Sequence, residues 1–456
     1  MMDTSDSEAV IPEHKDYYAD HLAQVNESSN QVLASDDIYN SQGILLLRKG
    51  AQLDNKFSSQ ITKHKLLKPI EQNIELENSL NGKIILERFH ALLDAYPDLK
   101  KLHESHEFEN VISGFLLGKQ LHPILTQKLT IMAEQLPDQL TDGIFSAWLS
   151  ALVAHQMQMN QHEVYDAFLT GLIHDIGMIH LDPEVILSKS KLEEEGVKVF
   201  QSHVVVGSVI LHDIAGVPES ISRAVLEHHE RCDGSGYPHG RLGRKISKAG
   251  KILGIVDAIL TLRVENFQAQ GRHIGDALLY LKLNESTFSS EVFRAMYSVI
   301  SKANLAVTER NPYDSIKDYA TQLKIQSESM LSLMPNLMLL LTHMWDIEKV
   351  FSNNTIKAVI SQTSRIINTL KRSGLLFDEQ IEWLDELINA PSNEVLLELN
   401  NIDYMLEETI RQLKNNHYHL CLIRDADVKL AEEDRKYIND ALESFGECFN
   451  ASKTEC

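Results

Sequence analysis

Apolar residues recur at every third or fourth position over long segments of the chain, and this period constrains the fold most strongly. The pattern is clearest in two neighbouring segments, residues 138–158 with Ile144, Trp148 and Leu152, and residues 161–177 with Val164, Phe168, Leu172 and Ile176. Residues at this spacing share one face of an α-helix. The same reasoning predicts helices over residues 193–212, over a segment that ends at His229, and over residues 246–262. We therefore expect a mainly α fold.

The chain has 456 residues, and single hydrophobic cores rarely grow beyond about 250–300 residues, so we expect two or three domains. We expect residues 1–40 to be a loosely held acidic N-terminal segment, called the lead-in below. Residues 42–54 are expected to form short strands, and residues 57–67 a small helix. The predicted divisions are a lead-in with a small α/β appendage (1–80), a helical connector (81–137), a main helical domain (138–314) and a C-terminal helical bundle (315–456), with breaks in the bundle at Pro335, Gly374 and Pro391.

Charge and composition exclude several classes of protein. A net charge of −22 argues against binding to a DNA or RNA polymer, which requires basic surface, but not against a small anion held by metal ions. The four cysteines are dispersed without a CxxC pair, as expected of free thiols in a reducing compartment. The N-terminus lacks a signal-peptide core, and the apolar run at 337–341 is too short to cross a bilayer. We expect a cytoplasmic protein without a membrane span.

Successive predicted helices bring histidine or aspartate into apolar surroundings. The residues concerned are His174, Asp175, His203, His228, His229 and Asp257. A carboxylate or imidazole in such a place must be paired, hydrogen-bonded or bound to metal. Mixed imidazole and carboxylate ligands suit iron, manganese, zinc or nickel, whereas the absence of thiolates argues against a structural zinc site. The alternative is a group of hydrogen-bonded core histidines, which suits one such residue better than a whole series.

A loop rich in small residues follows the histidine pair, with the sequence Asp233-Gly234-Ser235-Gly236-Tyr237-Pro238. Its glycines allow the backbone to come close to a ligand, and its proline stiffens the exit. A surface turn after a helix would explain the glycines and the proline, but it would not explain the paired histidines in front of them.

In this order and spacing, the His174-Asp175 pair, His203, the His228-His229 pair, Asp257 and the GYP loop resemble the HD-GYP family of the HD superfamily. The resemblance covers roughly residues 138–270 and implies a helical phosphohydrolase core within residues 138–314. It implies hydrolysis of cyclic di-GMP to pGpG or GMP with two or three divalent transition metals, iron or manganese being favoured. His174 and Asp175 would be catalytic metal ligands, with His203, His228, His229 and Asp257 as further ligands. Gly236, Tyr237 and Pro238 would bind substrate. A second His-Asp pair, His212-Asp213, lies too close to His228 to fit the family spacing.

The sequence departs from the family pattern at three positions, and a fourth matches only some members. Asp142 stands where the family has a histidine, and Asp138 lies where some members have an extra acidic ligand. Both can bind hard divalent metals, but both also suit the first turns of a helix, where negative charge is favoured. Met178 replaces a lysine, and Asn266 replaces an arginine that grips phosphate. Arg263, one helical turn earlier, is the expected substitute for that arginine.

These departures leave competing functions open. The first is a metal-dependent cyclic di-GMP phosphodiesterase, and the second is a weak or inactive relative that serves as a cyclic dinucleotide receptor or signalling scaffold. A third keeps the chemistry with another cyclic dinucleotide. The amphipathic C-terminal region also leaves homodimerisation or a signalling partner open.

Overall fold

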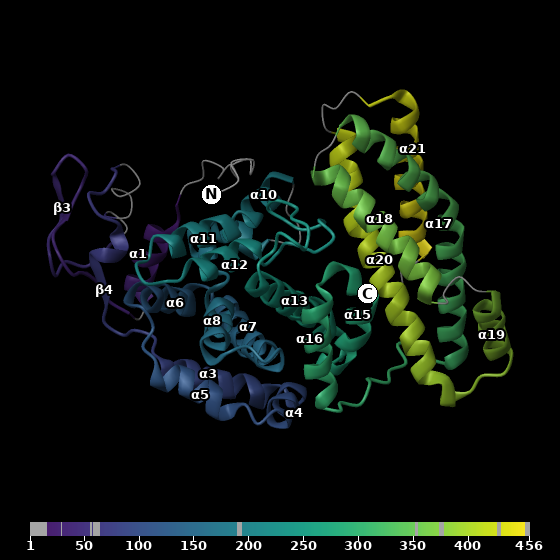
Figure 1. Ribbon diagram of the computed structural model, residues 1–456, viewed down its shortest axis with the longest axis horizontal. Coiled ribbons are helices and arrows are strands. Elements are labelled where there is room, and N and C mark those ends of the chain that lie inside the picture. The colour runs from purple at the N-terminus through teal and green to yellow at the C-terminus, as the bar shows by residue number, and fades with distance from the viewer. Residues whose placement is uncertain are drawn as a thin grey trace. The chain divides into compact units, whose positions relative to one another are not determined.

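The computed structural model describes residues 16–28, 30–54, 57, 64–188, 194–351, 354–373, 378–425 and 430–451. Helices dominate this part of the chain, and its strands form short antiparallel pairs, so the predicted mainly α fold is confirmed (Figure 1). Contacts divide the chain into two compact units, each of them discontinuous in sequence. Unit 1 comprises residues 1–229, 246–264 and 294–303, and unit 2 comprises residues 230–245, 265–293 and 304–456. The predicted domain boundaries stay predictions.

The N-terminal region combines a helix with two strand pairs. β1 (Val32–Ala34) pairs with β4 (Ile74–Leu76), which follows the short 3-10 helix η1 (Ile70–Gln72), and β2 (Ile38–Tyr39) pairs with β3 (Leu45–Leu47). Of the strands predicted over residues 42–54, β3 is present, but its partner β2 lies upstream of that range. The helix predicted over residues 57–67 lies largely outside the described residues.

The first helix, α1 (Tyr18–Ser28), is packed against the rest of unit 1, so the prediction of a loosely held lead-in is wrong for these residues. Tyr18, Leu22 and Val25 are fully or almost fully buried. The spacing of these side chains places them on one helical face, which packs against α6. The acidic composition of the segment hid this short amphipathic element.

The helices of unit 1 that follow are α3 (Gly82–Ala95), α4 (Pro97–Ser105), α5 (Glu109–Gly118), α6 (Pro123–Gln135), α7 (Pro137–Gln156), α8 (Gln161–Ile173), η2 (Ile176–His180), α9 (Pro183–Leu187), α10 (Glu194–Gln201), α11 (His203–His212), α12 (Glu219–Glu227) and α13 (Lys248–Leu262). Four of these helices start with proline, whose fixed φ and missing N–H suit the first helical position. α7 and α8 pack along one another (Figure 1). Glycine permits this packing, because a Cβ at Gly171 would lie 2.4 Å from the Ser146 carbonyl oxygen.

Two helix predictions were too long. The segment 161–177 leaves α-helical geometry after Ile173 and continues as the 3-10 helix η2, and the segment 193–212 is divided at Ser202 into α10 and α11. Ile176 keeps the apolar stride of α8, so the period alone concealed the change. Each break places a histidine at a helix end: His174 follows the last residue of α8, and His203 is the first residue of α11.

The elements from residue 263 onward are the π-helical turn η4 (Arg263–Phe267), α14 (Gln268–Gln270), η5 (Ile274–Asp276), α15 (Ala277–Leu283), η6 (Glu285–Thr287), α16 (Ser290–Lys302), α17 (Ile316–Val350), α18 (Asn354–Ser373), α19 (Asp378–Asn389), η7 (Asn393–Val395), α20 (Leu396–Asp425) and α21 (Glu432–Ala451). The long helices α17, α18, α20 and α21 pack as a bundle (Figure 1). Their shared core includes Leu337, Ile366, Leu413 and Phe445.

The predicted break at Pro335 is wrong, because α17 continues through it. Proline removes the hydrogen bond to the carbonyl four residues earlier, here that of Leu331. Pro335 and Leu331 both lie on the exposed side of the helix, where water can satisfy that carbonyl. The break at Pro391 is present between α19 and η7, and the break at Gly374 lies outside the described residues. Among the described helices, none combines the length and apolarity needed to span a membrane.

Candidate metal centre and nucleotide loop

The His174-Asp175 pair lies in the turn between α8 and η2. Gly177, just inside η2, allows this turn to press against the start of α11, because a Cβ there would lie 2.1 Å from the His203 carbonyl oxygen and 2.7 Å from the Gly207 nitrogen. No side chain fits in that space. The glycine therefore brings the first histidine-aspartate pair next to the helix that begins with His203.

Three buried imidazoles share one orientation. Each Nδ1 contacts the backbone carbonyl three residues earlier: His174 to Gly171 at 2.8 Å, His203 to Phe200 at 2.7 Å and His228 to Val225 at 2.6 Å. A carbonyl can only accept, so Nδ1 carries a proton in each ring, and Nε2 is the nitrogen that is left to bind a ligand. A histidine at a helix end can thus satisfy one nitrogen locally and present the other as a ligand.

The three Nε2 atoms converge on the carboxylate of Asp175. The distances are 3.3 Å from His174 to Oδ2, 3.4 Å from His203 to Oδ1 and 3.8 Å from His228 to Oδ1. These histidine side chains are at most 1% exposed and that of Asp175 is 12% exposed. One carboxylate thus lies at the centre of ligands from three different parts of the chain.

A second pair lies beside the first cluster. Nδ1 of His229 lies 3.1 Å from Oδ2 of Asp257, which α13 presents among apolar side chains. The rings of His228 and His229 are 4.1 Å apart between centroids. The structure therefore brings all six residues of the predicted core series into one region of unit 1.

A buried glutamate holds the two helices that carry this second pair. Glu227 ends α12, is fully buried, and accepts hydrogen bonds from Arg223 Nε at 2.9 Å and from the Ser247 backbone nitrogen at 2.7 Å. Ser247 in turn caps α13 by accepting from Gly250. Glu227 therefore fixes the start of α13 against the end of α12. The sequence pattern did not predict this role.

Burial and the Asp175 carboxylate shift the pKa values of the histidines in opposite directions. Burial disfavours the charged imidazole, but in His174 the Asp175 carboxylate outweighs it and raises the pKa to about 9. Burial lowers the pKa of His203 to about 4, and together with the neighbouring His229 it holds the pKa of His228 well below its usual range. Burial would raise the pKa of Asp175, yet the surrounding histidines hold it far below its ordinary value. The shifts leave His203 and His228 neutral beside an ionised Asp175, as metal ligands must be, whereas His174 would have to release its proton when a metal binds.

This donor set fits a divalent transition metal. Within the described part of the chain, Nε2 of His174, Nε2 of His203 and Oδ1 of Asp175 are buried without a hydrogen-bond partner. Leaving such atoms unsatisfied is unfavourable unless a ligand uses them. Two overlapping groups have donor atoms within 4.8 Å of one another, His174 with Asp175 and His228, and His203 with His228 and His229.

The two aspartates of α7 lie outside these groups. Asp138 is exposed in the first turn, as the helix dipole favours. Asp142 is half-buried beside Gly143, where a Cβ would lie 2.8 Å from the carbonyl oxygen of Leu172, two residues before His174. The expected ligand roles of Asp138 and Asp142 stay predictions.

The loop with Gly236, Tyr237 and Pro238 belongs to unit 2. Its frame is Glu230, 4% exposed, whose two carboxylate oxygens accept from the backbone nitrogens of His239 at 2.8 Å and Arg241 at 2.7 Å. Glu230 therefore closes the loop upon itself. The substrate-binding roles of the loop residues stay predictions.

The positions expected to contact phosphate have other surroundings. Arg263 is 6% exposed and stacks its guanidinium on the ring of Tyr96 at 3.9 Å. Met178 is 5% exposed within η2, an environment that suits its thioether and not a charged lysine. The role of Arg263 in substrate binding stays a prediction. The rejected pair His212-Asp213 is exposed at the end of α11.

The histidine at the end of η2, His180, belongs to a largely buried charged network. His180 lies between Asp16 Oδ1 at 2.8 Å from its Nδ1 and Lys128 Nζ at 3.0 Å from its Nε2, and it stacks on Tyr18. Lys128 is 1% exposed and also contacts Glu71 at 2.9 Å. The N-terminal appendage is thereby tied to η2. No local signal revealed this network, because its members are distant in sequence.

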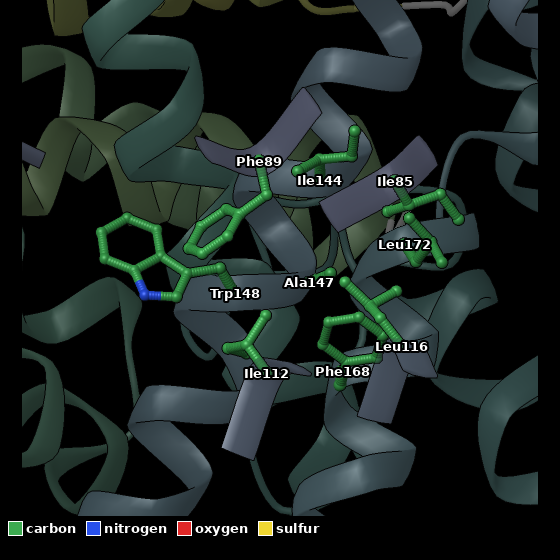
Figure 2. A pocket seen from close by; sticks show the side chains of 9 residues that line it. All are labelled: Ile85, Phe89, Ile112, Leu116, Ile144, Ala147, Trp148, Phe168 and Leu172. Carbon is green, nitrogen blue, oxygen red and sulfur yellow. The ribbon is translucent and has the colours of Figure 1, made fainter. Parts of the chain in front are cut away.

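Figure 2 shows an apolar cavity between helices of unit 1. Its lining comes from α3, α5, α7 and α8: Ile85, Phe89, Ile112, Leu116, Ile144, Ala147, Trp148, Phe168 and Leu172. Because it presents hydrocarbon and aromatic surface, it suits core packing and not a phosphate-containing ligand. It lies among the side chains that support the end of α8.

Comparison with known proteins agrees with this geometry. Residues 119–292 match the model of the HD domain family. This match covers less than half of the chain. The expected resemblance to the HD superfamily is confirmed, and the finer assignment to HD-GYP proteins stays a prediction.

Three curated relatives are similar to a part of this chain. A cyclic di-GMP phosphodiesterase of Thermotoga maritima is 32% identical over 24% of this chain and 30% of its own length. The cyclic di-GMP phosphodiesterase response regulator RpfG of Xanthomonas campestris is 31% identical over 31% and 39%. The 3'3'-cGAMP-specific phosphodiesterase 1 of Vibrio cholerae is 33% identical over 24% and 25%. The chain thus spans well under half the length of these relatives.

Proposed function

We propose that the HD domain is a metal-dependent phosphodiesterase that hydrolyses cyclic di-GMP. The observation that carries the proposal is the convergence of His174, His203 and His228 on Asp175, with the His229–Asp257 pair adjacent. These residues would hold two or three divalent ions, iron or manganese. Metal bound there would supply Lewis-acid stabilisation of phosphate charge and lower the pKa of water.

The protein's own residues would hold and orient the reactants. The backbone hydrogen bonds of the histidines fix their rings before any ligand arrives, so little reorganisation is required. Gly236, Tyr237 and Pro238 would contact the nucleotide. Water would add to phosphorus as the bond to the ribose O3' breaks, and the ribose oxygen would take up a proton, giving linear pGpG. A second hydrolysis would yield two GMP molecules.

A receptor that binds nucleotide without turnover is the second candidate. The buried Met178 and the stacking of Arg263 on Tyr96 favour it, because both positions then contribute little positive charge to phosphate. A third candidate retains the hydrolysis with cyclic GMP-AMP as the substrate, since a relative from Vibrio cholerae carries that specificity in its name.

The deciding experiment compares the full chain with Asp175→Ala and Asp213→Ala. Each protein is prepared anaerobically with Fe(II) or Mn(II), its metal content is measured, and products from cyclic di-GMP and 3'3'-cGAMP are identified by mass spectrometry. We expect wild type to form pGpG or GMP, Asp175→Ala to lose metal and turnover together, and Asp213→Ala, altered in the exposed pair, to match wild type. Tight nucleotide binding without product under every metal would replace the enzyme with the receptor. Preferential cleavage of 3'3'-cGAMP would change the substrate.

A further inference from the structure

An arginine of the C-terminal bundle contacts the nucleotide loop. Nη1 of Arg365, in α18, lies 2.9 Å from Oδ2 of Asp233, and the side chains are 10% and 12% exposed. Both residues belong to unit 2. Little water reaches such a pair, so its attraction is weakly screened and each charge depends on the other.

The same carboxylate organises the start of the loop. Oδ1 of Asp233 accepts hydrogen bonds from the backbone nitrogen of Ser235 at 3.0 Å and from its hydroxyl at 2.6 Å. Gly234 between them has φ +80°, a conformation that other residues rarely adopt. Asp233 thus uses one oxygen to shape the turn before Gly236 and Tyr237, and the other to meet the bundle.

The backbone that carries Arg365 is held in place by the packing of the bundle. Its neighbour Ile366 is fully buried in the bundle core, and Thr363, one turn earlier, accepts a hydrogen bond from Asn416 of α20 at 2.8 Å. These contacts set the rotation of α18 about its axis. The position of the guanidinium therefore follows from the packing of the bundle.

We propose that Arg365 is a positioning residue that acts through Asp233 on residues 234–238, so that the C-terminal bundle sets the conformation of the loop that binds the cyclic dinucleotide. The expected effect on catalysis rests on the proposed function, whereas the expected effect on the conformation of the loop does not. Glu230 closes the loop upon itself, and the Asp233–Arg365 pair fixes it to α18. Loss of the pair would free the turn while leaving the metal-binding histidines with their own contacts.

The test uses the full chain with Arg365→Gln, Arg365→Lys and, as a matched control, Arg372→Gln, which alters an exposed arginine of the same helix. Amide hydrogen exchange of residues 230–245 is measured by mass spectrometry, together with metal content, kcat and KM for cyclic di-GMP. We expect faster exchange in this segment for Arg365→Gln, unchanged metal content, and a roughly tenfold or larger loss of kcat/KM carried mainly by KM. Lysine keeps the charge and should restore part of both, whereas Arg372→Gln should match wild type.

Exchange in residues 230–245 that is identical in Arg365→Gln and wild type would overturn the proposal, whatever the activity. Wild type without turnover would instead contradict the proposed function and leave the exchange result decisive. If Arg365→Gln does not fold, Asp233→Asn addresses the pair from the loop, with the same expected and contrary outcomes.

Discussion

At the scale of single residues, close backbone contact is as decisive for the metal centre as its ligands. Gly177→Ala should separate η2 from α11, because the new Cβ would meet the His203 carbonyl at 2.1 Å. We expect a loss of stability of roughly 1–3 kcal/mol, as for other overpacked sites, and a clear fall in bound metal. Denaturant titration and metal analysis measure the two effects. Gly114→Ala in α5 is the control, since nothing lies within 4 Å of its new methyl group, and it should stabilise slightly. Equal behaviour of the two variants would contradict this role of Gly177.

His180 makes a second prediction at this scale, on pH. Burial, and then the facing Lys128 ammonium, lower its pKa despite the contact with Asp16 and the nearby Glu71. The unfolded chain therefore takes up a proton near pH 6.5 that the folded chain resists, so stability is present above that pH and declines as pH falls towards the folded pKa. His180→Asn should reduce this decline in denaturant titrations between pH 7.5 and 5.5. His162→Asn, in which an exposed histidine changes, should keep the wild-type slope. An unchanged slope in His180→Asn would sink the explanation.

At the scale of elements, the periodicity of the sequence predicted which segments are helical but not where each helix ends. Ile176 continues the apolar stride of α8, yet the chain tightens into η2, because Gly177 packs against α11. That contact joins segments distant in sequence, which a local pattern cannot reveal. The ligand-type residues were predictable because histidine and aspartate are conspicuous in apolar segments. Glu227, Lys128 and Arg365 were missed because charged residues are ordinary in helices until their burial is known.

At this scale, we predict that replacing the proline inside α17, Pro335, stabilises the protein. Pro335→Ala should restore one backbone hydrogen bond and improve helix propensity on the exposed side of the helix, where alanine meets no steric conflict. The intrinsic difference is about 3 kcal/mol in a helix interior, so we expect a gain of roughly 1–3 kcal/mol. Thermal unfolding measures it. Pro391→Ala, between α19 and η7, should show no comparable gain, and an equal gain in both variants would contradict the argument.

At the scale of the whole molecule, the metal should stabilise one unit preferentially. The six candidate ligands of the core series all lie in unit 1: His174, Asp175, His203, His228, His229 and Asp257. A ligand that binds only the folded state stabilises it by about 2.7 kcal/mol at a hundred times its dissociation constant. Adding Mn(II) to metal-free protein should therefore slow amide exchange in α8, α11, α12 and α13 more than in α17 to α21. Uniform slowing would mean that the two units open together.

The alternation of the chain between the units also bears on its synthesis. The chain crosses between them after residues 229, 245, 264, 293 and 303. A ribosome releases the chain from its N-terminus, so unit 1 has all of its segments once residue 303 has emerged. The loop at 230–245 has by then long been made, but Arg365 has not. A nascent chain would thus have every segment of unit 1, with its candidate metal ligands, before the arginine that holds the loop is made.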